Sequence, residues 1–190
     1  GAEVIDSADK ILWMPDAVAY MLTGNAVTEY TVASTSEMLN PATGDLDAEL
    51  LDSIGLSRSK FGPMVQPGHV IGTILPQLQE ATGLGEIPVI AVAGHDTASA
   101  VIGVPTPDTD YAYLSCGTWS LLGIESPEAI INEKSFGYNF TNEGGIDGTT
   151  RFLKNICGLW IFERVRAELG LQDADISELA ASCHDSVCRS

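Results

Sequence analysis

Residues 87–101 read Ile-Pro-Val-Ile-Ala-Val-Ala-Gly-His-Asp-Thr-Ala-Ser-Ala-Val and contain the most informative pattern in the chain. The apolar run at 87–93 does not alternate with polar residues, which is typical of a strand buried on both faces of a parallel sheet. Gly94 ends this run, and the small residues at 97–103 predict a short helix after it. A buried strand followed by a helix favours an α/β architecture, in which helices cover the sheet.

Polar residues stand directly where this strand ends, at His95, Asp96 and Thr97. In an open α/β sheet, ligands bind beyond the carboxyl ends of the strands, so these side chains are expected to face a cleft. The carboxylate of Asp96 could accept a proton from a substrate hydroxyl. Asp96 or Thr97 could equally cap the following helix. His95 could orient a ligand hydroxyl or could be a structural histidine, and the pattern alone leaves both interpretations open.

A glycine-centred turn is expected at Gly117-Thr118, between strand-like runs at 111–115 and 119–125. Glycine would allow a positive φ and a close approach of backbone amides to a ligand, and Thr118 adds a hydroxyl donor. Such a turn could hold phosphate oxygens without cationic side chains. The plainer interpretation is an ordinary two-residue hairpin turn. A third strand is predicted over 136–141.

The clearest amphipathic helix covers 156–169, with Arg164, Arg166 and Glu168 on its water-facing side. Asn155 stands at its start, where it could be a plain N-cap or could direct its amide toward a nucleotide. Proline and glycine positions predict further short helices, at 14–22, 47–54 and 76–82.

The 190 residues include 26 acidic and 9 basic side chains, a formal net charge of −17, and 45% are hydrophobic. The chain can bury a core, but it has no basic stripe, which argues against a general nucleic-acid or anionic-membrane binder. It has no run of 18 apolar residues and no basic and apolar leader, so neither a membrane span nor a signal peptide is expected. The four scattered cysteines are expected to be free thiols in a reducing cytoplasm, and no zinc site is expected at the nearest group of potential ligands, Cys183, His184 and Cys188.

Four stretches occur in a specific order and spacing, namely 87–101, Ala112-Tyr-Leu-Ser-Cys-Gly-Thr-Trp-Ser-Leu121, Asn142-Glu-Gly-Gly145 and Leu153-Lys-Asn-Ile-Cys-Gly-Leu-Trp160. Shorter segments agree with them, namely Trp13-Met-Pro-Asp16, Leu22-Thr-Gly24 and Glu29-Tyr-Thr31. In these stretches the chain resembles the FGGY carbohydrate kinases over most of its length. The sequence contains no G-x-x-x-x-G-K-[ST] P-loop and no G-x-G-x-x-G motif, so a nucleotide would have to be bound by another scheme.

The resemblance implies a pair of actin-like (ribonuclease-H-like) domains, with a sugar and ATP in the cleft between them. Residues 1–105 would be the C-terminal part of the first, sugar-binding domain, and residues 106–190 the N-terminal part of the second, nucleotide-binding domain. The proline-rich segment 105–110 would link them. Family members are much longer, so we expect an internal piece, with the first phosphate loop before it and the adenine motif after it. We expect that this piece alone does not phosphorylate a sugar.

By the same resemblance, Asp96 is the base that activates a sugar hydroxyl, while His95 and Thr97 line the sugar site. The implied reaction converts ATP and L-rhamnulose to ADP and L-rhamnulose 1-phosphate. Two alternatives remain open. One is another ketose or polyol kinase of the family, acting for example on L-fuculose or xylulose, and the other is an inert fragment that serves only as a binding module.

The nucleotide side of the site is also implied by the resemblance. Gly117 and Thr118 would belong to a phosphate-binding hairpin, and Asn155 and Glu163 match nucleotide-contacting positions. Family members tend to carry Gln where this chain has Glu163, which would bring a negative charge near the nucleotide. ATP and Mg²⁺ are the expected cofactors, because Mg²⁺ would offset the repulsion between phosphate oxygens and an acidic protein.

Overall fold

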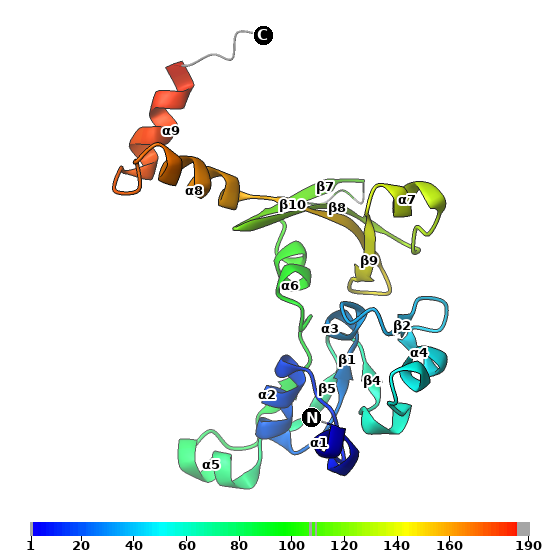
Figure 1. The fold of residues 1–190 in the computed structure, drawn as a ribbon. Helices are drawn as coiled ribbons and strands as arrows, with labels where there is room; N and C mark the ends of the chain where they lie inside the picture. The colour runs from blue at the N-terminus through cyan, green and yellow to red at the C-terminus, as the bar shows by residue number, and fades with distance from the viewer. Residues whose placement is uncertain (1, 107, 109, 186–190) are drawn as a thin grey trace.

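The computed structural model describes residues 2–106, 108 and 110–185, and it consists of two lobes (Figure 1). The first lobe carries several short helices and two-stranded pairings, and the second is built on one four-stranded sheet. Helix α6 (Asp96–Ile102) lies between the lobes and packs against strand β7 (Ala112–Cys116) (Figure 1). Asp96 and Thr97 stand at the start of this helix, and Gly117 follows strand β7 directly.

The helices predicted in the first lobe are confirmed. Pro15 opens α2 (Met14–Thr23), and Gly24 ends it with a left-handed φ of 76°. Asp47 caps α4 (Ala48–Ser53), because its carboxylate accepts hydrogen bonds from the first free backbone N–H groups of that helix. The other helical segments of this lobe are α1 (Ala2–Ser7), α3 (Tyr30–Ser34), a 3₁₀ turn (Arg58–Lys60) and α5 (Pro76–Thr82).

The strand predicted at 87–93 differs from the expectation. Only β6 (Pro88–Ile90) is extended, and it pairs antiparallel with β5 (Val70–Thr73) rather than in a parallel sheet. The side chains of Ile90 and Val92 are 51% and 67% exposed, so the prediction of burial on both faces is wrong. Among the described residues, β6 pairs with one strand only, on one edge. An apolar run in a sequence does not indicate whether other elements will cover both faces of the strand. The remaining pairings are β1 (Thr28–Glu29) with β4 (Met64–Val65), in parallel, and β2 (Leu39–Asn40) with β3 (Asp45–Leu46).

The second lobe is an antiparallel sheet with the strand order β7-β8-β10-β9. The predicted hairpin is confirmed, since β7 and β8 (Trp119–Ser126) pair across the turn at 117–118. The predicted strand at 136–141 is instead helix α7 (Glu133–Gly137), followed by β9 (Thr141–Gly144). The cause is a capping box, in which Asn132 and Ser135 exchange side-chain and backbone hydrogen bonds and start a helix.

Strand β10 (Thr150–Cys157) was not predicted from the sequence, and it extends into the start of the helix predicted at 156–169, because it pairs with β8 along its full length. Asn155 is therefore a strand residue opposite Leu121, and not the N-cap of a helix. Helix α8 (Leu159–Glu168) begins only after Gly158, and α9 (Ile176–Asp185) follows it. Arg166 is also not water-facing as predicted, because its guanidinium is buried and donates to the carbonyls of Gln172 and Ala174.

The core consists of three small clusters of buried side chains. Two lie in the first lobe, around Val65 and around Phe61, and the third joins Val101 of α6 to Tyr113 and Leu153 of the sheet. The third cluster fixes α6 on the second lobe, so burial of apolar surface holds the start of this helix near the hairpin turn. Within the described residues, no helix is long and apolar enough to cross a membrane. Cys116 and Cys157 are free and exposed, whereas the side chains of Cys183, His184 and Cys188 lie outside the described part of the structure.

Candidate functional site

A cavity of about 490 Å³ lies where the start of α6 meets the β7–β8 hairpin. It contains most of the side chains predicted from the sequence, namely His95, Asp96, Thr97, Gly117 and Asn155. Three further polar residues line it, namely Thr35, Ser115 and Glu143. Both lobes therefore contribute residues to its lining.

Asp96 offers a free carboxylate oxygen to this cavity. Its side chain is 95% exposed, and its Oδ1 atom accepts hydrogen bonds from the backbone N–H of Thr97 at 2.7 Å and from the Thr97 hydroxyl at 3.3 Å. Its Oδ2 atom accepts no hydrogen bond from any described residue. The alternative role as a helix cap does not fit, because His95 occupies the N-cap position and Asp96 is already in the helix. Oδ2 is thus available to take a proton.

The backbone before Asp96 is held by a buried carboxylate from the first lobe. The side chain of Glu29 accepts hydrogen bonds from the backbone N–H of Gly94 at 2.8 Å and from both the backbone and hydroxyl groups of Thr31. The Thr31 hydroxyl oxygen in turn accepts a bond from the backbone N–H of His95 at 3.2 Å. A Cβ atom at Gly94 would lie 2.9 Å from the Glu29 carboxylate, so this position requires glycine.

A second buried carboxylate supports Glu29. Both side-chain oxygens of Asp16 accept a hydrogen bond from the backbone N–H of Glu29, at 3.2 and 3.3 Å. The pKa of Asp16 is raised from 3.8 to about 6, mainly by burial and to a smaller extent by the charge of Glu29, while the hydrogen bond from the Glu29 backbone opposes the shift. Asp16 and Glu29 fall in the short segments that match the family, but nothing in their spacing pointed to the loop that they hold.

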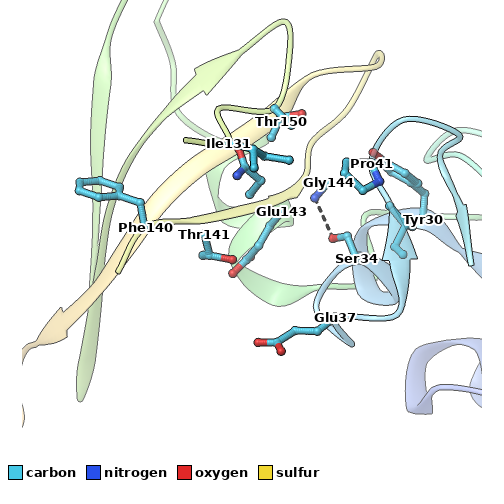
Figure 2. Close-up of a pocket in the computed structure, with 13 residues that line it drawn as sticks. Tyr30, Ser34, Glu37, Pro41, Ile131, Phe140, Thr141, Glu143, Gly144 and Thr150 are labelled. Atoms are coloured by element: carbon cyan, nitrogen blue, oxygen red, sulfur yellow. Dashed lines mark hydrogen bonds between the residues drawn. The ribbon is translucent and has the colours of Figure 1, made fainter. Parts of the chain in front are cut away.

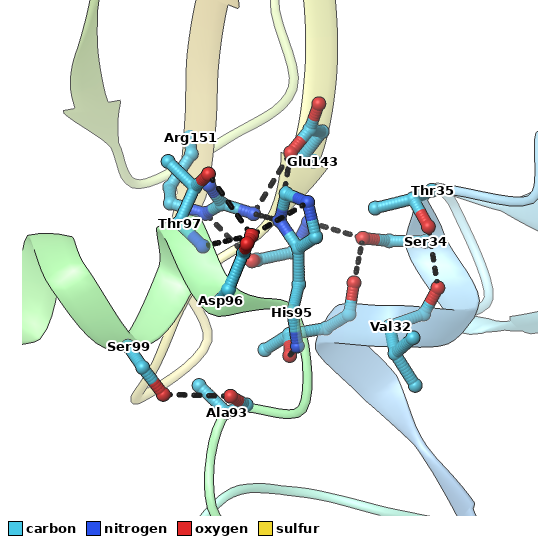
Figure 3. A network of polar contacts seen from close by, with 12 residues as sticks. Val32, Ser34, Thr35, Ala93, His95, Asp96, Thr97, Ser99, Glu143 and Arg151 are labelled. Carbon is cyan, nitrogen blue, oxygen red and sulfur yellow. Dashed lines mark hydrogen bonds and ion pairs between the residues drawn. The ribbon is translucent and has the colours of Figure 1, made fainter. Parts of the chain in front are cut away.

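The ring of His95 is held from the second lobe by residues that the sequence did not identify (Figure 3). Arg151 on β10 lies opposite Glu143 on β9, and its Nη2 atom is 2.9 Å from the Glu143 carboxylate and 3.0 Å from Nδ1 of His95. Arg151 is 1% exposed, so this cation is fully buried between the lobes. A signal for Glu143 was present, because the stretch 142–145 matches the family, whereas Arg151 is a lone basic residue without a motif.

The hairpin turn differs from its expected geometry. Gly117 does not adopt a positive φ, and its N–H group donates to the carbonyl of Trp119 at 3.0 Å. The expectation of a positive φ at Gly117 is therefore wrong, and its own N–H group is engaged within the turn. The carbonyls of Gly117 and Thr118 accept hydrogen bonds from Leu159 and Trp160 and so anchor the start of α8. The residue that requires glycine is Gly158, whose Cβ would lie 2.4 Å from the Gly117 carbonyl oxygen.

Of the other residues predicted to contact a nucleotide, one lines the cavity and two lie outside its lining. Asn155 is exposed and lines the cavity, whereas Thr118 is exposed at the turn and lies outside the cavity lining. Glu163 is on α8, also outside the lining, where its carboxylate accepts two hydrogen bonds of 3.0 Å from Arg166. The structure thus brings Gly117 and Asn155 into one cavity with His95, Asp96 and Thr97 but does not bring Glu163 there.

The cavity offers few ligands for a metal ion. Its carboxylates are those of Asp96 and Glu143, and Glu143 is already paired with Arg151. In the described part of the chain, no group of three or more His, Cys, Asp and Glu side chains could hold a metal. This donor set fits a Mg²⁺ ion that is bound mainly by phosphate oxygens and water, with a protein carboxylate as a minor partner.

A further pocket of about 280 Å³ continues along the seam between α3 and β9 (Figure 2). At this seam the backbone N–H of Gly144 donates to the Ser34 hydroxyl oxygen at 2.7 Å, and the ring of Tyr30 lies against Gly144. Glu143 lines this pocket as well as the larger cavity. The lobes therefore meet at a polar seam that begins at the cavity.

Comparison with known proteins places the chain in a family. Residues 2–103 match the profile of the N-terminal domain of the FGGY family of carbohydrate kinases, and residues 112–187 match that of the C-terminal domain. The chain belongs to the FGGY family. It is 54% identical over 182 residues to the rhamnulokinase of Bacteroides thetaiotaomicron, covering 94% of this chain and 37% of that protein. It is 48% identical to the rhamnulokinase of Pectobacterium atrosepticum, covering 89% of this chain and 33% of that protein. The chain thus spans about a third of the length of these relatives.

The fold is also that of the family. The structure resembles the ligand-bound xylulose kinase of Lactobacillus acidophilus with a TM-score of 0.73 and 24% identity, over 87% of this chain and 33% of that one. FGGY sugar kinases have the actin-like ATPase fold, so the predicted fold class is confirmed. At this identity the likeness concerns the fold and carries no information about the sugar.

Proposed function

We propose that this chain carries the phosphoryl-acceptor site of an ATP-dependent sugar kinase, with L-rhamnulose as the acceptor. The observation that supports it most is the cavity that joins His95, Asp96 and Thr97 of one lobe to Gly117 and Asn155 of the other. The choice of sugar rests on the relatives of highest identity named above, which are rhamnulokinases. The matches at 2–103 and 112–187 favour a domain boundary between them, in keeping with domains at 1–105 and 106–190.

In this proposal Asp96 is the general base. Its free Oδ2 atom accepts the proton of the reacting hydroxyl as the sugar oxygen bonds to the γ-phosphorus of ATP and the bond from that phosphorus to ADP breaks, while Oδ1 stays engaged with Thr97. General bases of this kind contribute roughly 10²–10⁴-fold to a rate. His95 and Thr97 position the sugar beside this carboxylate, and closure of the polar seam excludes water, which would otherwise compete with the sugar.

On the nucleotide side, Asn155 and the turn at Gly117 and Thr118 bind the phosphates of ATP in this proposal. Asn155 is exposed, and its side chain makes no hydrogen bond to any described residue, so its amide is available to a ligand. Glu163 would have to leave Arg166 before it could contact a nucleotide. Mg²⁺, when bound, would neutralise phosphate charge, with the carboxylate of Asp96 within the same cavity. A cytoplasmic location, expected from the free thiols, is part of the same proposal.

The proposal is tested by a chimera. The matching 182-residue segment of the Bacteroides thetaiotaomicron relative is replaced by this chain, and ADP release is measured with L-rhamnulose, L-fuculose and D-xylulose. The parent enzyme is the control. We expect kcat/KM for L-rhamnulose to exceed that for the other sugars by about 100-fold or more, which is typical of discrimination by hydrogen-bonding sites.

Two outcomes would contradict the proposal in different ways. A preference for L-fuculose or D-xylulose would assign the chain to another sugar kinase of the family. ATP binding without turnover of any sugar, in a folded chimera, would instead favour a binding module.

A further inference from the structure

We propose that Arg151 is a positioning residue that fixes the tautomer of His95, so that its Nε2–H group faces the cavity as a hydrogen-bond donor. The inference deepens the proposed function, on which its consequence for the sugar rests. Arg151 belongs to the second lobe and does not line the cavity, whereas His95 belongs to the first and does. The proposal therefore makes the sugar side of the site depend on a residue of the opposite lobe.

The guanidinium of Arg151 has a fixed orientation (Figure 3). The register of β9 and β10 places Glu143 directly opposite Arg151, and Nη2 donates to the Glu143 carboxylate at 2.9 Å. The Nε atom donates to the carbonyl of Gly144 at 3.1 Å. Two bonds to one strand hold the planar group in place, so the second hydrogen of Nη2 has a defined direction.

That second hydrogen determines which nitrogen of His95 carries the proton. Nη2 lies 3.0 Å from Nδ1 of His95, and a guanidinium can donate but cannot accept a hydrogen bond. Nδ1 must therefore be the acceptor, which leaves the proton of the neutral ring on Nε2. The carboxylate of Glu143 lies 3.4 Å from the same Nδ1 and would favour the opposite tautomer, but the contact with Arg151 is shorter.

The tautomer matters because of where Nε2 lies. It is 3.6 Å from Oδ1 of Asp96, in a ring that is one-quarter exposed and lines the cavity. An Nε2–H group can donate to a sugar hydroxyl or carbonyl oxygen next to Asp96, which a bare nitrogen cannot do. The hydrogen bond from the backbone N–H of His95 to the Thr31 hydroxyl fixes the other end of the residue, so the donor points in one direction.

The burial of Arg151 supports a role beyond stability. Among the described residues its Nη1 atom has no hydrogen-bond partner, although it is fully buried, and the nearby hydroxyl of Tyr113 is buried without one as well. Burying a cation with an unpartnered nitrogen costs stability, and a pair of apolar residues would avoid this cost. The hydrogen bond by which Arg151 fixes the tautomer of His95 offers a reason why position 151 carries an arginine.

The direct test is nitrogen NMR of the histidine rings in the 190-residue chain at about pH 8, well above the ordinary histidine pKa of roughly 6.5. Long-range ¹⁵N–¹H spectra distinguish Nε2–H from Nδ1–H rings. The chain has three histidines, and the signals lost in His95→Gln identify His95. We expect a pure Nε2–H tautomer for His95. An Nδ1–H tautomer, or a ring protonated on both nitrogens, would overturn the proposal without any further variant.

Three variants then test the part played by Arg151. Arg151→Lys keeps a cationic donor and is expected to keep the Nε2–H tautomer, whereas Arg151→Met is expected to give a mixture of both. Arg164→Gln is the matched control, because Arg164 is an exposed arginine on α8, where it contacts Glu168 and the ring of Trp160 and not His95. A pure Nε2–H tautomer in a folded Arg151→Met variant would show that Arg151 does not determine it.

If Arg151→Met fails to fold, Glu143→Gln tests the competing contact. This variant keeps Arg151 and removes the carboxylate that favours an Nδ1–H ring, so His95 is expected to stay in the Nε2–H form. A mixture of tautomers in this variant would show that the contact with Arg151 does not fix the ring and would overturn the proposal.

The consequence for the sugar is measured in the chimera. Loss of one well-oriented hydrogen bond in Arg151→Met should raise KM for L-rhamnulose about three- to tenfold, with KM for MgATP unchanged and partial rescue by Arg151→Lys. An unchanged KM for the sugar would overturn the positioning role. Failure of the proposed function looks different, because a chimera that accepts no L-rhamnulose would leave the tautomer of His95 measurable and unaltered.

Discussion

Two glycine-containing turns face the cavity, and they are held in different ways. The turn at 94–96 is fixed by side chains from distant parts of the chain, namely Glu29, Thr31 and Arg151. The turn at 117–118 is fixed by backbone hydrogen bonds alone, to Trp119 and to the start of α8. The proposed sugar side is therefore held by polar contacts between distant parts of the chain, whereas the proposed nucleotide side is held by local strand pairing.

The largest loss of stability is expected when the support of the first turn is removed. In Glu29→Gln, the amide NH₂ would face N–H groups that now donate to a carboxylate, so at least one buried donor loses its partner. We expect the free energy of unfolding to fall by about 2–4 kcal/mol. Urea unfolding of the chain measures this change. Glu80→Gln, at an exposed position on α5, is the control, and an equal small effect in both variants would refute the support by Glu29.

A smaller loss is expected at the junction of the second turn with α8. A Cβ atom in Gly158→Ala would lie 2.4 Å from both the Gly117 carbonyl oxygen and the Ser120 hydroxyl oxygen, so the backbone must shift. Overpacking of this kind costs about 1–3 kcal/mol. Gly137→Ala is the matched control, since a Cβ there meets no atom within 4 Å. Equal unfolding free energies in the two variants would contradict the described junction.

The buried Asp16 predicts a dependence of stability on pH. The pKa of Asp16 is raised from 3.8 to about 6 in the folded chain, so the folded chain binds this proton more tightly than the unfolded chain does. The resulting contribution to the free energy of unfolding is fully present below pH 3.8 and is lost as the pH rises through 6. Asp16→Asn removes this loss and is expected to stabilise the chain at pH 7 on the order of 1–2 kcal/mol.

The measurement for Asp16 is the free energy of unfolding of both proteins at several values between pH 4 and 7. The difference between Asp16→Asn and the unaltered chain should grow with pH over this interval. A constant difference would mean that Asp16 does not titrate there.

The smallest effect is expected at Gly117 itself. Its φ is not positive, and a Cβ would meet only the Trp119 carbonyl oxygen, at 3.4 Å. Gly117→Ala is therefore expected to change the free energy of unfolding by less than about 0.5 kcal/mol, as at ordinary surface positions. Thermal or urea unfolding decides, and a loss as large as that of Gly158→Ala would show that the turn needs the freedom of glycine.

The two turns also mark what the sequence could predict. The hairpin around Gly117 was predicted because alternation and a central glycine are local signals, and helix α2 because Pro15 and Gly24 mark its ends. The parallel pairing predicted for the strand at 87–93 was wrong, because an apolar run does not indicate which strand it will pair with or in which direction. The helix at 133–137 was not predicted, because the aromatic residues that follow its start favour a strand, whereas the capping box of Asn132 and Ser135 starts a helix.

For the site, the motifs located part of one cavity. Of the residues that matched the family, His95, Asp96, Thr97, Gly117 and Asn155 line this cavity, whereas Thr118 and Glu163 lie outside its lining. Glu29 and Arg151 were missed, because each acts through a contact with a residue more than 50 positions away. No pattern within a single segment can reveal such a pair.

The central claim is that Asp96 is the base of a sugar kinase, and it is tested most directly by kcat of Asp96→Asn in the chimera with L-rhamnulose. Asn keeps the size and hydrogen bonding of the side chain but cannot take a proton, so we expect kcat to fall by roughly 10²–10⁴-fold with little change in KM for the sugar. Asp52→Asn, at an exposed position on α4, is the control and should leave kcat unchanged. A kcat for Asp96→Asn within about threefold of the unaltered chimera, well below a general-base contribution, would contradict the assignment.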